Sequence, residues 1–77
     1  MQIPTEVTDR FYAGARTEAV QFVINDSVRV KSGPHAGRTG AVVSIVALDP
    51  ETTFLVEPGT QPYADLRIPQ AHLELAE

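Results

Sequence analysis

The stretch that decides the fold is NDSVRVKSGPHAGRTGAVVSIV, from Asn25 to Val46. Two runs rich in β-branched residues flank a segment that carries Gly33, Gly37 and Gly40. Alternation of apolar and polar residues with a period of two is typical of a strand with one buried face. Three glycines within eight residues between two such strands are best explained by loop geometry. Gly37 and Gly40 permit a positive φ or a close approach of the loop to the sheet.

The same period of two extends in both directions from this stretch. Val28 and Val30 are expected on one face of a strand, with Arg29 and Lys31 on the other. A single helical turn, PQAH, opened by Pro69, is expected near the C-terminus. We therefore predict a mainly β fold, a small antiparallel SH3-like β-barrel of about five strands, whose closure would remove exposed edges. Runs with strand character cover residues 20–25, 27–31, 39–48, 53–57, 64–68 and 73–75.

A short N-terminal helix is expected over residues 4–14, PTEVTDRFYAG. Thr5 is the expected N-cap, and Gly14 the residue just beyond the helix. Val7 and Phe11 are four residues apart and would form its buried stripe, packed on the barrel or on a second copy. We divide the chain into an N-terminal helical extension (1–19) and the barrel (20–77).

Composition limits the class of protein. The chain has 77 residues, which allows one domain, and no cysteine for a disulfide or a thiolate metal site. It contains no apolar run long enough to span a bilayer, and its first residues do not resemble a signal peptide. A cytoplasmic location is expected. The net charge of −4 is unlike that of a strongly basic nucleic-acid-binding domain.

The pattern VxVxxGxxxGxxGxV, from Val28 to Val42, resembles the KOW motif of the transcription elongation factor NusG and of several ribosomal proteins. Asp26 and the apolar residues before it are similar to that family too, and the resemblance covers roughly residues 22–75. It implies an SH3-like barrel. One departure concerns nucleic acid, because Ala36 stands where nucleic-acid-binding members often carry a basic residue.

One basic group stands out in this acidic chain. No acidic residue occurs from Ser27 to Ile45, a segment that carries Arg29, Lys31 and Arg38, with His35 beside them. These side chains are either a solvated face that offsets the acidic body or an edge that meets an RNA backbone or an acidic protein surface. With three full charges, RNA binding would be weak.

The aromatic residues fall into two groups. Phe11, Phe22 and Phe54 lie at expected apolar positions and are assigned to the core, whereas Tyr12 and Tyr63 are expected at the surface. Single-strand binders need aromatic platforms beside basic residues, and one loop tyrosine is a thin platform. Tyr63, in a proline-rich loop, fits a protein contact at least as well.

Catalytic and metal-binding patterns are absent from the sequence. The glycines lack the Lys-Ser/Thr of a phosphate-binding loop, and the carboxylates are dispersed. His35 and His72 are far apart in sequence, so we expect an exposed loop residue and a partly buried end-of-turn residue rather than a metal site. We predict no catalytic residue, metal or cofactor, and no enzyme.

These observations favour a non-enzymatic interaction module. The first choice is protein contact within a larger assembly, through the glycine loop and the loop around Tyr63. The alternatives are a weak RNA-binding KOW domain and a small SH3-like accessory subunit of an electron-transfer complex. The oligomeric state stays open between monomer and dimer.

Overall fold

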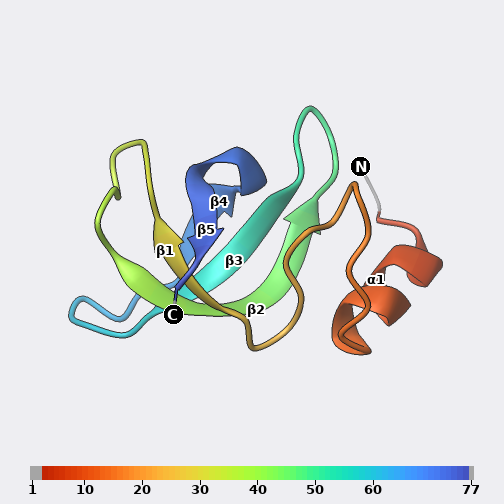
Figure 1. Ribbon diagram of the computed structural model, residues 1–77, viewed down its shortest axis with the longest axis horizontal. Coiled ribbons are helices and arrows are strands. Elements are labelled where there is room, and N and C mark those ends of the chain that lie inside the picture. Colours follow the sequence, from red (N-terminus) through yellow and green to blue (C-terminus); the bar gives the residue numbers. More distant parts are fainter. Residues whose placement is uncertain (1–2, 77) are drawn as a thin grey trace.

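The computed structural model of the protein describes residues 3–76. Within that range one helix precedes a single antiparallel sheet of five strands in the order β4-β3-β2-β1-β5 (Figure 1). The predicted mainly β fold with a short N-terminal helix is therefore confirmed. The elements are α1 (Thr5–Tyr12), β1 (Ser27–Val30), β2 (Thr39–Ala47), β3 (Thr53–Pro58), β4 (Leu66–Pro69), the 3-10 turn η1 (Gln70–His72) and β5 (Leu73–Leu75).

The sheet curls around the core but does not close by strand pairing. β2 is its central and longest strand, and its register with β3 shifts twice, between Val42 and Ser44 and between Ile45 and Ala47. Such irregularities bend a strand and increase its twist. β4 and β5 remain the two edges, joined by η1. The closed barrel predicted from the sequence is thus only loosely matched, because no backbone ladder joins these edges among residues 3–76.

Three phenylalanines form the centre of the core, as predicted. Phe11 and Phe54 are fully buried, and Phe22 is nearly so. The rings of Phe11 and Phe54 stack with their centroids 6.0 Å apart, and Phe22 meets Phe54 edge to face at 5.8 Å. Offset-stacked and edge-to-face rings at these distances are favourable arrangements. Helix α1 is therefore held on the sheet through Phe11.

Helix α1 begins and ends close to the predicted positions, with one correction. Thr5 is not the N-cap, because Pro4 takes that position and no side chain caps the helix. Pro4 lacks an amide hydrogen and its carbonyl accepts the first helical hydrogen bond, from Thr8. At the other end Gly14 has a φ of +79°, just after the C-cap Ala13, as predicted.

The strand predicted over residues 20–25 is wrong. This segment is extended but joins no ladder, and it ends in a turn in which Asn25 has a φ of +69°. The Asp26 carboxylate accepts a hydrogen bond from the Val23 amide, at 2.9 Å. Only the end of this segment reaches the sheet, where the Asn25 amide donates to the Val42 carbonyl of β2 at 2.8 Å. Its apolar side chains line the core without strand pairing, which explains why its period resembled that of a strand.

Candidate functional site

The β1–β2 loop depends on glycine at defined points. Gly33 and Gly37 have φ angles of +85° and +94°, in the left-handed region that other residues seldom adopt. A side chain on Gly33 would also begin 2.9 Å from Nδ1 of His72. Glycine is required at position 40 for a different reason, because a Cβ there would lie 2.2 Å from the carbonyl oxygen of Glu57. The glycine spacing therefore serves the loop and the pairing of β2 with β3.

Arg38 joins two loops into one surface. Its guanidinium donates hydrogen bonds to the carbonyl oxygens of Thr60 and Pro62, at 2.7 and 3.0 Å. The Gly59 amide donates to the carbonyl of Thr39, at 3.0 Å, next to this contact. Both loops lie at the end of the sheet opposite α1 (Figure 1). We call residues 31–38 and 59–65 together the loop surface.

Tyr63 is the large aromatic side chain of the loop surface, and it is 59% exposed. Its loop is held at two points, by the contacts that Arg38 makes on either side of Gln61. An exposed aromatic ring on a fixed loop resembles the anchors that dominate protein interfaces. The contacts of Arg38 with Thr60 and Pro62 place the loop that carries Tyr63 beside the glycine loop.

The four basic residues predicted as one edge are divided by the structure. Arg29 faces Glu74 across the β1–β5 pair, and its guanidinium lies 2.6 Å from the carboxylate. Arg38 is directed to backbone carbonyls of the second loop. Lys31 is exposed and takes part in neither of the two ion pairs found among residues 3–76. Of the three full charges, only that of Lys31 is left without a partner there.

His35 differs from its prediction. It is half-buried rather than exposed, because the loop folds back in successive turns, with the Arg38 amide donating to the His35 carbonyl at 3.2 Å. His35 and His72 line one pocket of about 260 Å³, although they are distant in sequence. The Lys31 amide donates to the His72 carbonyl at 2.7 Å and fixes η1 beside the loop.

Arg67 on β4 also lines this pocket and was missed by the sequence analysis. The sequence did contain a signal for Arg67. Because Leu66 and Ile68 were expected to point inward, Arg67 between them should have been assigned to the outer face of the strand. No acidic residue lines the pocket, so it presents one guanidinium and two imidazoles to solvent. The lining residues are Val30, Ser32, Pro34, His35, Arg67, Ile68, Pro69 and His72.

Two further features, a metal site and a membrane-spanning helix, were looked for in residues 3–76. No group of three or more His, Cys, Asp or Glu residues within residues 3–76 could hold a metal ion. None of the helices in that range is long and apolar enough to pass through a membrane.

Comparison with known families adds a family assignment to this geometry. Residues 24–57 match the model of the KOW motif, from the turn before β1 to the last residues of β3. The KOW motif is thus matched over 34 of the 77 residues. The match contains all three glycines and the whole β1–β2 loop, so the resemblance predicted from the glycine spacing is confirmed. KOW motifs are non-catalytic modules that bind RNA or protein in larger assemblies. No curated protein is significantly similar to the chain in sequence.

Proposed function

We propose that this KOW protein is a cytoplasmic, non-enzymatic interaction module that uses its loop surface to contact an acidic face of a protein partner in a larger assembly. Tyr63 is the apolar anchor of this contact. Lys31 supplies the positive charge beside it, and His35 and Arg67 extend the polar rim. Aromatic anchors surrounded by polar rims are the usual anatomy of protein interfaces.

The observation that carries this proposal is the position of Arg38. By bonding two carbonyls of the second loop, it fixes both loops before any partner binds. A fixed surface loses less conformational entropy on binding than two mobile loops would. The same contacts withdraw Arg38 from phosphates, while Glu74 occupies Arg29. Both loops are thus held in place, and of Arg29, Lys31 and Arg38 only Lys31 has no bonding partner of its charge among residues 3–76.

Weak RNA binding is the second candidate, and the pocket of His35, His72 and Arg67 favours it. With Lys31 and Arg67 each on one phosphate, a plot of the logarithm of the binding constant against that of the salt concentration would have a slope of roughly −1.5. Two phosphate contacts give only a low affinity for RNA at physiological salt, unless a larger complex adds further contacts. The lining contains no Phe, Tyr or Trp, so bases could stack there only on the imidazoles of His35 and His72 or on the Arg67 guanidinium.

Two assays on the same variants separate these candidates. Tyr63→Ala and Lys31→Gln change the loop surface, and Glu51→Gln is the control, because it removes one exposed charge in the connection between β2 and β3, at the opposite end of the sheet. In affinity capture from host extract, we expect the first two variants to lose the protein partner that the wild type and the control retain. In fluorescence anisotropy with a generic single-stranded RNA at 50 and 300 mM salt, we expect little binding. Micromolar RNA binding that Lys31→Gln weakens and Tyr63→Ala does not would establish the RNA alternative instead.

A further inference from the structure

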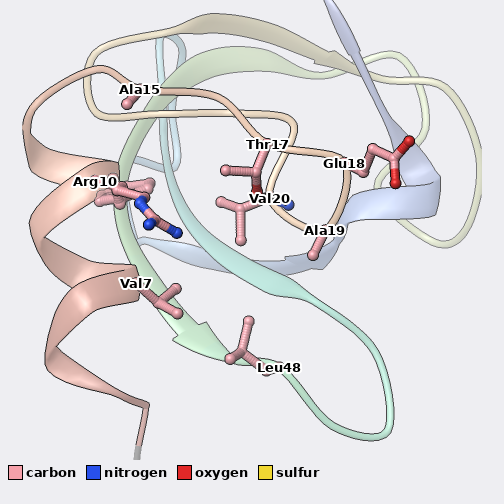
Figure 2. Close-up of a pocket in the computed structure, with 9 residues that line it drawn as sticks. Val7, Arg10, Ala15, Thr17, Glu18, Ala19, Val20 and Leu48 are labelled. Carbon is pink, nitrogen blue, oxygen red and sulfur yellow. Dashed lines mark hydrogen bonds between the residues drawn. The ribbon is translucent and has the colours of Figure 1, made fainter.

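A second pocket lies at the other end of the molecule, between α1, the linker that follows it and the end of β2 (Figure 2). Its volume is about 400 Å³, in the lower part of the usual range for ligand sites. It contains no residue of the loop surface. A ligand here would therefore leave the loop surface uncovered.

The walls of this α1 pocket are mainly apolar. Phe11 and Val20 form its inner wall and are buried in the core. Val7 and Leu48 form the outer walls and are only half-buried, so an apolar group between them would remove more of their surface from water. At about 25 cal/mol per Å², such burial favours a hydrocarbon occupant.

Arg10 provides the positive charge of the α1 pocket. It lies three residues after Val7, hence on the same face of the helix, and Figure 2 shows its guanidinium extending over the cavity. Arg10 belongs to neither of the two ion pairs among residues 3–76. Glu18 is the acidic residue in the lining, and its carboxylate points away from Val7 and Leu48 in Figure 2. The cavity thus combines apolar walls with one unpaired guanidinium.

We propose that the α1 pocket binds a peptide segment of a partner protein in which an apolar side chain adjoins a carboxylate. The side chain would pack between Val7 and Leu48, and the carboxylate would pair with Arg10. A guanidinium binds a carboxylate through two parallel hydrogen bonds, which fixes the direction of the bound chain. The linker residues 15–19 at the rim are exposed and have no regular secondary structure. The Ala15 and Thr17 amides and the Glu18 and Ala19 carbonyls already make hydrogen bonds within the protein. The amides of Glu18 and Ala19 have no acceptor among residues 3–76, so they could bind a peptide carbonyl, which a simple hydrocarbon acid lacks.

The test uses the full chain, ¹⁵N-labelled, and two probes that differ in one charge, N-acetyl-Ala-Leu and its C-terminal amide. We expect amide shift changes at Val7, Arg10, Val20 and Leu48 but not at residues 59–65. The acid should bind about tenfold more tightly than the amide, as a charge-assisted hydrogen bond provides. Arg10→Gln should bring the acid down to the affinity of the amide. Lys31→Gln, the matched charge change on the loop surface, should alter neither.

Three results would overturn the proposal. They are an absence of shifts at the α1 pocket with both probes at millimolar concentration, equal affinity of acid and amide for the wild type, and stronger binding of hexanoate than of the peptide acid. Stronger binding of hexanoate would mean that the α1 pocket takes a free apolar acid instead of a peptide. The spectrum of Arg10→Gln reports its folding directly, so a lost fold is not mistaken for a lost site. Because the loop surface is read separately at residues 59–65, failure here is distinguishable from failure of the proposed function.

Discussion

Replacing Gly40 by alanine should separate two paired strands. The new Cβ would lie 2.2 Å from the carbonyl oxygen of Glu57 and 3.0 Å from Cα of Pro58, whereas ordinary contacts begin at 3.4 Å. These atoms belong to the backbone of β3, opposite Gly40 in the register, so no flexible side chain can move aside. β2 and β3 must therefore move apart by about 1 Å, out of a spacing of about 4.8 Å.

The magnitude follows from what this displacement breaks. One or two ladder hydrogen bonds at about 1 kcal/mol each, with strain of about 1–3 kcal/mol, give a loss of about 2–5 kcal/mol in the free energy of unfolding. A chain of this length has a total of roughly 4–12 kcal/mol. At about 4–8 °C per kcal/mol, Tm should fall by roughly 8–40 °C.

Gly59→Ala is the matched control, because it adds the same methyl group in the adjoining loop. Its Cβ would meet only the carbonyl oxygen of Thr39, at 3.8 Å, an ordinary contact. We expect its free energy of unfolding to stay within about 0.5 kcal/mol of wild type. Urea unfolding monitored by circular dichroism would measure both variants. Equal stabilities of Gly40→Ala and Gly59→Ala would refute the steric argument.

Three further changes test other parts of the fold. Phe11→Ala should lower the free energy of unfolding by about 3–5 kcal/mol, because the ring is fully buried against Phe54. Urea unfolding measures this loss, and a smaller loss would favour treating residues 1–19 as an extension separate from the sheet. Asp26→Ala should lower it by about 1–2 kcal/mol, since the carboxylate accepts from the Val23 amide and pairs with Arg16; an unchanged midpoint would contradict the turn geometry. Arg38→Gln should leave Tm within a few degrees but increase amide hydrogen exchange in residues 59–65, whereas unchanged exchange would mean that the second loop is held by other contacts.

The elements that the sequence predicted correctly are those fixed by local pattern. Alternation placed Val28 and Val30 inward, and the proline before η1 and the glycine after α1 marked turns that the structure contains. The segment 20–25 failed because a period of two reports which side chains are buried, not whether a neighbouring strand has an edge to pair with. That depends on the order of strands in the sheet, which no local window contains.

The candidate site was harder to predict because its charges are paired across long separations in sequence. Arg29 and Glu74 meet through the β1–β5 register, 45 residues apart. Arg38 reaches carbonyls in a loop whose position is set by the β2–β3 ladder. The sequence therefore identified the residues of the loop surface, but not which of their side chains make hydrogen bonds or ion pairs within the protein. Whether Lys31, His35 and Tyr63 act in recognition stays a prediction.

The stacking of Phe11 on Phe54 has a consequence for the order in which the chain can fold during synthesis. A helix of eight residues is unstable alone in water, and α1 has its ring partner only once β3 has emerged from the ribosome. Closing so long a segment carries an entropic cost that local contacts in α1 do not offset. The helix, which is synthesised before the sheet, is thus among the last of these elements to become stable. A nascent chain halted before β3 would leave Phe11 without its cover and available to chaperones or to other nascent chains.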